Sequence, residues 1–307
     1  MQNLFNEFSN FDIPNADDDE STETKFFELP SYADYITEQD KKSGKSKDYQ
    51  LPKDVKANKD ILKIIKYKTN KHDIKQRPLM ERNIIPSHPS SVIFNGRSGS
   101  GKSNLLVNLL TRSEFYGRAK EHDPKSHYFD LVWLFSPTCY NDDLPKYLDI
   151  AENRMFDSNF EKPLDHIITT QKNLIEKKGL DQSPKILIIF DDIQSQERFM
   201  RSPNFTKMFI QNRHHNISTW VCCQSFTRLP RVCRLQANNL FIFPSSGSET
   251  EILVNEFCPP NTKKREFEQL VKHATNERFN FLHINMRCEP EKRYRRNLDT
   301  ILKIKNQ

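Results

Sequence analysis

The sequence predicts an α/β fold in which a mainly parallel sheet is covered by helices on both faces. From about residue 80, short apolar segments alternate with segments of helical spacing. The run Lys185–Phe190 is almost entirely apolar, which is typical of a strand buried on both faces. Three of the seven glycines, Gly96, Gly99 and Gly101, cluster between the first expected strand and the first expected helix. Together these observations indicate a sheet between two helical layers.

The individual elements follow from local patterns. Ser91–Asn95 is a short apolar run and predicts the first strand, and leucines at helical spacing predict a helix over Ser103–Thr111. Asp165–Thr169 is expected to be a short strand that precedes a helix at Gln171–Lys178. The remaining strands are expected at Tyr128–Phe135, Lys185–Phe190, Ile217–Cys223, Leu240–Phe243 and Phe279–Met286, and the remaining helices at Phe205–Arg213, Ser248–Phe257 and Thr262–Ala274.

Charge divides the chain into a tail and a domain. Residues 1–40 carry eleven acidic side chains and one basic side chain, whereas residues 41–80 carry thirteen basic and four acidic ones. Such blocks are typical of solvated or interacting segments, so we expect residues 1–80 to form a charged, disordered N-terminal tail. Within it, Asp60–Tyr67 is expected to be a strand or short helix that leads into the domain. Residues 81–307 are expected to form the folded domain.

Composition excludes several classes of protein. No run of about 18 apolar residues occurs, so we expect no membrane span. Met1–Asn10 lacks the basic and apolar regions of a secretory signal, so we expect a protein that is not secreted. The six cysteines are scattered and form no CxxC pair. A zinc site and a disulfide framework are therefore disfavoured, and a reducing compartment is expected.

The glycine cluster forms a complete GxxxxGK[ST] motif between the expected strand and helix. Glycines let the backbone curl so that successive N–H groups point at phosphate oxygens, and the following helix adds its positive N-terminal end. The lysine supplies a cation for the phosphates, and the hydroxyl that follows it can ligate Mg²⁺. We therefore predict a nucleotide phosphate site at Gly96, Arg97, Ser98, Gly99, Ser100, Gly101, Lys102 and Ser103.

Polar side chains follow two further strands. Asp191 ends the apolar run and is expected to hold Mg²⁺ opposite Ser103. The next residue, Asp192, is expected to orient or deprotonate an attacking water. Gln224 ends the strand Ile217–Cys223 and is expected to sense the γ-phosphate or align that water, because central strands of such sheets end side by side.

In their order along the chain, these motifs resemble the genome-packaging ATPases of large DNA viruses, the poxvirus type included, within the FtsK–HerA group of translocases. The resemblance rests on the segments GRSGSGKS, Leu134–Pro137, the run IIFDD, Arg213–His215 and Gln224–Ser225. It implies a P-loop NTPase with a RecA-like additional-strand core over residues 81–307. It also implies ATP and Mg²⁺ as ligands, a homo-oligomeric ring, and ATP-driven movement of double-stranded DNA into a preformed capsid.

The same resemblance implies partners and places. Capsid or portal-vertex proteins are the implied protein partners, and the implied location is the host cytoplasm or a viral factory, or association with the virion. A ring ATPase needs an arginine that neutralises γ-phosphate charge, and Arg213 and Arg234 are the candidates, with Arg228 and Arg231 nearby. The basic segment Arg287–Lys305, with seven basic and three acidic residues, suits contact with the DNA backbone or is a solvated tail.

Other functions remain open at this level. A translocase or helicase of the same group could act in segregation or DNA processing. A small-molecule P-loop kinase is disfavoured by the long interval between Gly96 and Asp191. A nucleotide-gated scaffold without turnover is disfavoured because Asp191, Asp192 and Gln224 are all present. His214 and His215 lack a third ligand at helical spacing, so a zinc site is disfavoured there as well.

Overall fold

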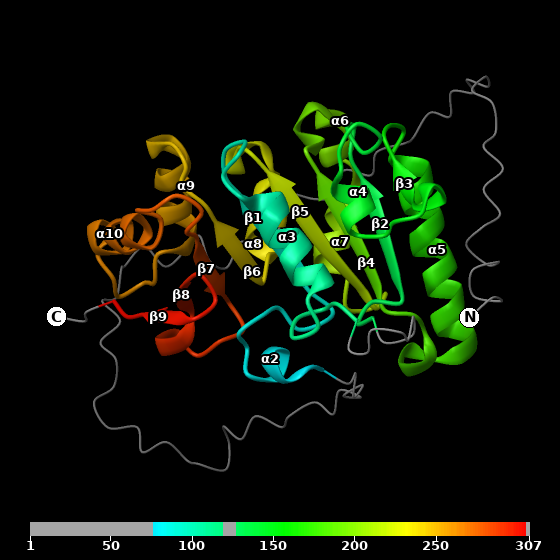
Figure 1. Ribbon diagram of the computed structural model, residues 1–307, viewed down its shortest axis with the longest axis horizontal. Helices are drawn as coiled ribbons and strands as arrows, with labels where there is room; N and C mark the ends of the chain where they lie inside the picture. The colour runs from blue at the N-terminus through cyan, green and yellow to red at the C-terminus, as the bar shows by residue number, and fades with distance from the viewer. Residues whose placement is uncertain (1–75, 119–126, 305–307) are drawn as a thin grey trace, which may run out of the picture. The chain divides into compact units, whose positions relative to one another are not determined.

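The computed structural model describes residues 76–118 and 127–304 (Figure 1). The predicted tail therefore lies almost entirely outside the described residues, as does the strand or short helix expected at Asp60–Tyr67. Met80, at the end of the predicted tail, is buried, and Gln76 donates a hydrogen bond to the carbonyl oxygen of His88. The last residues before position 81 are thus packed against the domain.

A single sheet of nine strands runs through the described part of the chain, in the order β3-β2-β4-β5-β1-β6-β7-β8-β9. Neighbouring strands from β3 to β6 are parallel, and β7, β8 and β9 are added antiparallel to their neighbours. The strands are β1 (Ser91–Asn95), β2 (Leu131–Phe135), β3 (Met155–Phe156), β4 (Ile186–Asp191), β5 (Ile217–Cys223), β6 (Asn239–Ile242), β7 (Leu282–Asn285), β8 (Tyr294–Arg296) and β9 (Thr300–Leu302). The mainly parallel sheet is confirmed. Because β5 lies between β1 and β4, so is the additional-strand arrangement.

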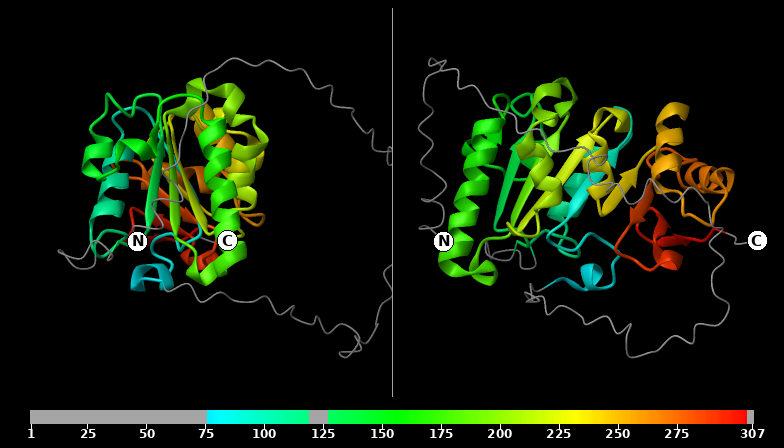
Figure 2. Two further views of the ribbon diagram at one scale, coloured as in Figure 1. Left: turned by 90° about the vertical axis from the view of Figure 1, so that its right-hand side faces the viewer. Right: turned by 180° about the vertical axis from the view of Figure 1, so that it is seen from behind.

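Helices cover both faces of this sheet, as predicted. Figure 2 shows α3 and α4 on one face and α5 and α7 on the other. The helices are α2 (Pro78–Glu81), α3 (Lys102–Thr111), α4 (Leu144–Tyr147), α5 (Glu161–Lys178), α6 (Glu197–Met200), α7 (Pro203–Ile210), α8 (Arg231–Gln236), α9 (Gly247–Phe257) and α10 (Lys264–Ala274). The helix of the glycine motif, α3, follows β1 directly, so the local order strand, loop, helix is as the motif requires.

Aromatic side chains fill the two layers between sheet and helices. On the face covered by α3, Phe94 stacks on Phe241 at 4.8 Å between ring centroids, and Tyr116 meets Trp220 at 5.1 Å. On the opposite face the chain packs five buried phenylalanines against one another: Phe135, Phe160, Phe190, Phe199 and Phe205. Burying each such ring contributes about 1.5–3 kcal/mol. This aromatic core fixes the strands whose ends carry the motif residues.

The strand predicted at Asp165–Thr169 is wrong. The whole segment belongs to the 18-residue helix α5, which buries Leu164, Ile167, Ile168 and Leu174 against the sheet. The short run of β-branched residues at 167–170 favours a strand locally. The apolar spacing of three and four residues along the longer segment, and its packing against the sheet, decide for the helix.

The basic C-terminal segment is part of the sheet and not a solvated tail. It contributes the antiparallel strands β8 (residues 294–296) and β9 (residues 300–302), and β8 pairs with β7 so that Arg295 lies opposite His283. All six cysteines are free and lie within the described residues. Among the described residues, no helix combines the length and apolar character needed to cross a membrane.

Candidate functional site

Three polar segments meet at the carboxyl edge of the parallel strands. In the sheet register, Asn95 of β1 lies beside Cys223 of β5, and Cys222 lies beside Asp191 of β4. The glycine motif and Gln224 therefore emerge close to the two aspartates, as the sequence predicts. They border a cavity of about 320 Å³, whose lining is Ser98, Gly99, Gly101, Lys102, Ser103, Asn104, Thr138, Asp142, Asp191, Asp192, Cys222, Gln224 and Phe279.

Two glycines of the loop are required by its geometry. A Cβ at Gly96 would lie 2.6 Å from the Cβ of Phe243 and 2.8 Å from the hydroxyl of Ser100, so no larger residue fits there. Gly101 has a φ of +106°, in the left-handed region that glycine adopts without strain. It is the last residue before α3. The loop therefore turns sharply into the helix, and Ser98, Gly99 and Gly101 line the cavity at the positive end of α3.

The Lys102 side chain lies against the backbone of the glycine loop. Its ammonium group donates to the carbonyl oxygen of Gly96 at 2.6 Å and to that of Arg97 at 3.0 Å. Its side chain lines the cavity together with the hydroxyl-bearing Ser103. A flexible cation that rests on carbonyl oxygens can exchange them for the oxygens of an anion, so the loop can accept a polyphosphate.

Asp191 is the buried acid of the cavity. Its side chain is enclosed at the end of β4, and this burial, with the negative charges of Asp192 and Asp142, raises its pKa to about 6, while Lys102 acts in the opposite direction. A carboxylate that is costly to ionise in isolation favours a nearby cation. Asp191 and the Ser103 hydroxyl are oxygen donors on one cavity, the donor type that Mg²⁺ prefers.

A metal held here would need further oxygen ligands. Among the described residues, no group of three or more histidine, cysteine, aspartate or glutamate side chains could hold a metal ion by itself. Two protein oxygens completed by phosphate oxygens and water fit the coordination of Mg²⁺, which keeps several waters and is commonly bound with substrate phosphates. The residues present therefore fit a Mg²⁺–polyphosphate complex.

Asp192 and Gln224 are joined across the two strand ends. The Gln224 side-chain amide donates to the Asp192 carboxylate at 2.9 Å. Asp192 has a φ of +49°, an uncommon value for a residue other than glycine, so the chain turns abruptly after β4. The side chain of Gln224 is exposed at the cavity. A carboxylate and an amide side by side can accept and orient a water molecule.

The two arginine candidates lie away from this constellation. Arg234 is 8% exposed and makes a two-pronged ion pair with Glu256, at 2.6 and 2.8 Å, while also donating to the carbonyl oxygens of Phe226 and Leu229. Its position in α8 thus gives it structural partners. Arg213 is exposed in the turn before β5, at the end of that strand opposite Gln224.

The residues at or beside the cavity that the sequence analysis did not predict include Asn104 and Cys222, which adjoin predicted site residues, and four others. Thr138 and Asp142 come from the segment between β2 and α4, and Phe279 comes from the turn before β7. Glu249 of α9 accepts hydrogen bonds from Ser225 and from other groups of the segment that follows Gln224. The Ser136–Pro137 pair that ends β2 was a signal that the next residues leave the sheet at the same edge. Nothing local marks Glu249.

Solved structures with some similarity to this chain include viral and bacterial proteins. The genome packaging NTPase B204 from Sulfolobus turreted icosahedral virus 2 is 16% identical, over 64% of this chain and 92% of its own, with a TM-score of 0.45. The N-terminal domain of zonular occludens toxin from Neisseria meningitidis is 13% identical, over 50% of this chain and 76% of its own, with a TM-score of 0.31. EssC (ATPases 2 and 3) from Geobacillus thermodenitrificans is 11% identical, over 64% of this chain and 38% of its own, with a TM-score of 0.43.

The sequence itself gives the decisive comparison. No curated protein matches it. The family described as poxvirus A32 protein matches residues 79–284, which is more than half of the chain. The match spans every motif residue of the cavity, from Gly96 to Gln224, and it confirms the resemblance to the poxvirus type. This chain therefore belongs to the poxvirus A32 protein family.

Proposed function

We propose that this protein is an ATPase that drives double-stranded DNA into a viral capsid. The observation that carries the proposal is the convergence of Lys102, Asp191, Asp192 and Gln224 on one cavity at the glycine loop. These are the groups needed to bind a nucleoside triphosphate and to hydrolyse it. Membership of the poxvirus A32 family supports the viral genome-packaging role.

Binding would begin at the loop. Its N–H groups and the N-terminal end of α3 would receive the β- and γ-phosphates, and Lys102 would leave its two carbonyl partners for the phosphate oxygens. Ser103 and Asp191 would hold Mg²⁺, which supplies shielding of the phosphate charge when it is bound. Ionised Asp191 is the form that takes the ion. Because its pKa is about 6, we expect this binding to weaken below that pH.

Hydrolysis would depend on the pair at the two strand ends. Asp192 accepts one hydrogen bond from Gln224, and its remaining lone pairs can accept a proton from a water molecule. The amide oxygen of Gln224 would accept a second hydrogen bond from the same water. The pair would thus orient the attacking oxygen toward the γ-phosphate and take up its proton.

Neutralisation of the γ-phosphate would come from a neighbouring subunit. Arg213 lies beyond the opposite end of β5 from Gln224, and seven strand residues span roughly 23 Å, so its side chain does not reach the cavity of its own subunit. Its exposure leaves it accessible to a second copy. A homo-oligomeric ring would bring such a residue to a neighbour's site, and capsid or portal-vertex proteins would bind the assembled ring.

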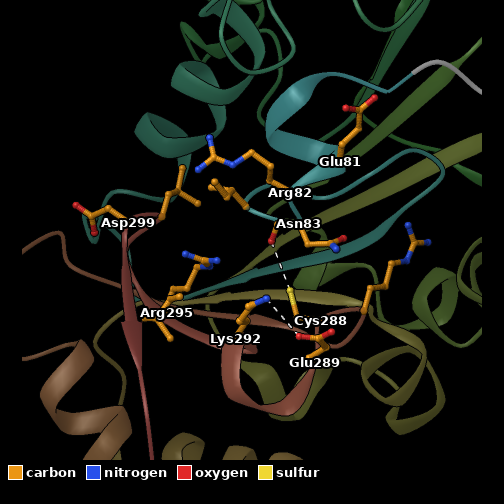
Figure 3. A pocket seen from close by; sticks show the side chains of 12 residues that line it. Glu81, Arg82, Asn83, Cys288, Glu289, Lys292, Arg295 and Asp299 are labelled. Atoms are coloured by element: carbon orange, nitrogen blue, oxygen red, sulfur yellow. Dashed lines mark hydrogen bonds and ion pairs between the residues drawn. The ribbon is translucent and has the colours of Figure 1, made fainter.

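Contact with DNA has a candidate surface at a second cavity, of about 990 Å³, between α2 and the C-terminal strands (Figure 3). Arg82, Lys292 and Arg295 line it, and acidic side chains there include Glu289, which pairs with Lys292 at 3.3 Å. Arg295 is 7% exposed, and its Nε has no hydrogen-bond partner among the described residues. A buried guanidinium nitrogen without a hydrogen-bond partner favours an anion such as a backbone phosphate nearby.

Measurement of ATP hydrolysis with and without double-stranded DNA tests the proposal. We expect hydrolysis to rise with DNA of any sequence, to vanish in Lys102→Ala with loss of ATP binding, and to vanish in Asp192→Asn with ATP binding retained. Lys177→Ala, at an exposed lysine of α5, is the matched control and should behave like the unsubstituted protein. Arg82→Ala should reduce the stimulation by DNA and leave hydrolysis without DNA unchanged.

Other outcomes would select other functions. Normal hydrolysis that is indifferent to DNA contradicts the motor. Transfer of phosphate to a nucleoside or nucleotide would identify a P-loop kinase, and ATP binding without turnover would identify a scaffold. Movement of DNA into purified capsids in the presence of ATP distinguishes packaging from segregation or processing by the same kind of translocase.

A further inference from the structure

Phe279 is an exposed aromatic residue at the glycine loop. Its side chain is 52% exposed, although most large apolar residues of the domain are buried. It lines the phosphate cavity, and a Cβ built on Gly101 would lie 3.2 Å from its Cδ1. Its φ of +70° is a strained value for a bulky side chain. Packing of the core does not explain a half-exposed ring in such a conformation.

Hydrogen bonds hold the turn that carries this ring. The backbone N–H of Asn280 donates to the carbonyl oxygen of Glu277 at 3.2 Å, and the Asn280 side chain donates to the Glu277 carboxylate at 3.0 Å. Asn297, beyond β8, donates to Asn280 at 3.1 Å and accepts from the N–H of Phe281 at 3.2 Å. These hydrogen bonds therefore fix the turn that carries the ring.

The ring lies on the side of the glycine loop away from Asp192 and Gln224, which form the hydrolytic pair. In the sheet, β5 and β4, which carry Gln224 and Asp192, lie on one side of β1, and β6 and β7 lie on the other. Phe279 precedes β7. A triphosphate whose γ-phosphate faces Asp192 and Gln224 would extend its remaining part along the loop toward the β6–β7 side, where this aromatic surface is exposed.

A cation accompanies the ring. The guanidinium carbon of Arg278 lies 4.7 Å from the centroid of Phe279. It leaves the ring half-exposed, and it places a planar, stackable cation beside the path of the ligand. An aromatic ring next to an arginine is the combination on which flat heterocycles stack without regard to their hydrogen-bonding edge.

We propose that Phe279, with Arg278 beside it, is the stacking platform for the base of the bound nucleotide. This inference rests on the proposed function, because it takes the glycine loop to be the site of the triphosphate. The platform binds the base of the ligand and leaves the phosphates to Lys102 and the loop. It therefore distinguishes a nucleoside triphosphate from a bare polyphosphate.

Binding of Mg–ATP and of Mg–tripolyphosphate to the full chain tests the platform. We expect Phe279→Gly, which removes the ring and relieves the strained φ, to weaken ATP binding about tenfold or more and to leave tripolyphosphate binding unchanged. Phe279→Trp should retain ATP binding, and its indole fluorescence should change with ATP but not with tripolyphosphate. Asp149→Gly, at another position of positive φ (52°), is the control for relief of strain and should bind both ligands normally.

The outcomes separate this inference from the function on which it rests. If the unsubstituted protein binds neither ligand, the proposed function fails. If it binds ATP and Phe279→Gly binds ATP equally well, the platform is wrong and the function stands. If Phe279→Gly loses both ligands to the same extent, the ring only supports the loop at Gly101, which also overturns the platform.

Discussion

Arg234 is one of two arginines that the sequence offers for neutralising γ-phosphate charge, and in this structure its guanidinium is buried against Glu256. The ion pair with Glu256 is buried, with each side chain 9% exposed, and the Nη1 group of Arg234 donates to two carbonyl oxygens. The sequence shows that this arginine lies in the segment after Gln224. It does not reveal that Glu256, 22 positions later, lies against it.

We expect Arg234→Ala to lower the free energy of unfolding by about 3–5 kcal/mol, because it leaves the Glu256 carboxylate buried and unpaired. Urea denaturation measures this change. Arg231→Ala is the matched control: Arg231 reaches the same carboxylate at 3.5 Å but is 72% exposed, so it should cost less than about 1 kcal/mol.

A double substitution, Arg234→Met with Glu256→Leu, separates stability from catalysis. It removes both buried charges, so we expect it to recover most of the stability that Arg234→Ala loses. We also expect the stable double variant to hydrolyse ATP like the unsubstituted protein. A stable but inactive double variant would instead assign Arg234 to the reaction.

At the scale of elements, α9 is linked to the segment that follows β5. Glu249, in the first turn of α9, accepts from the hydroxyl groups of Ser225 at 2.8 Å and Thr227 at 3.2 Å, and from the backbone N–H of Phe226. These three groups follow Gln224 directly. One carboxylate thus fixes the chain that carries the amide of the hydrolytic pair.

We expect Glu249→Ala to lower kcat for ATP about tenfold, because Gln224 would lose its fixed position, while the affinity for ATP stays unchanged. Steady-state hydrolysis and equilibrium nucleotide binding measure the two quantities. Glu251→Ala, at an exposed position of the same helix, is the control and should leave both intact. Equal losses of affinity and kcat would argue against a positioning role.

Element boundaries could be predicted where one helix or strand carries its own signal. The strand Ile217–Cys223 was predicted to the residue, since seven successive buried positions stand between polar turns. The strand at Asp165–Thr169 was wrong because three β-branched residues dominate a window that is shorter than the helix to which they belong. Strands β8 and β9 were not predicted, because each is only three residues long, too short to show an alternating pattern, and two of the three residues of β8 are arginines.

At the scale of the whole molecule, two buried histidines oppose the buried acid as pH changes. Burial lowers the pKa of His88 and of His283 to about 3 from an ordinary value near 6.5. Below pH 6.5 the unfolded chain protonates these two imidazoles, whereas the folded chain keeps them neutral. Their contribution to the free energy of unfolding therefore falls as the pH falls. The contribution of Asp191 to stability has the opposite sign. Because its pKa is raised, the folded state binds one more proton than the unfolded state between about pH 4 and 6, so this contribution rises as the pH falls.

Two histidines outweigh one aspartate, so we expect the melting temperature of the free protein to be lower at pH 5 than at pH 7. Thermal unfolding monitored by circular dichroism measures this difference. In Asp191→Asn the opposing group is absent, and the drop should be steeper. A melting temperature that stays constant or rises between pH 7 and pH 5 would contradict the neutral, buried state of His88 and His283.

The sequence by itself determined the phosphate loop and the apolar strand that ends in Asp191, because each is encoded in adjacent residues, whereas the order of the strands in the sheet depends on how distant segments pack. Gly96 to Ser103 and the run that ends in Asp191 need only a strand and a turn to act. Only the tertiary structure decided the surroundings of Arg234, Glu249 and Phe279, since Glu256, the segment after Gln224 and the glycine loop are distant from them in sequence. Burial, ion pairing and stacking depend on which elements pack together, and that packing is set by the aromatic core of the whole sheet.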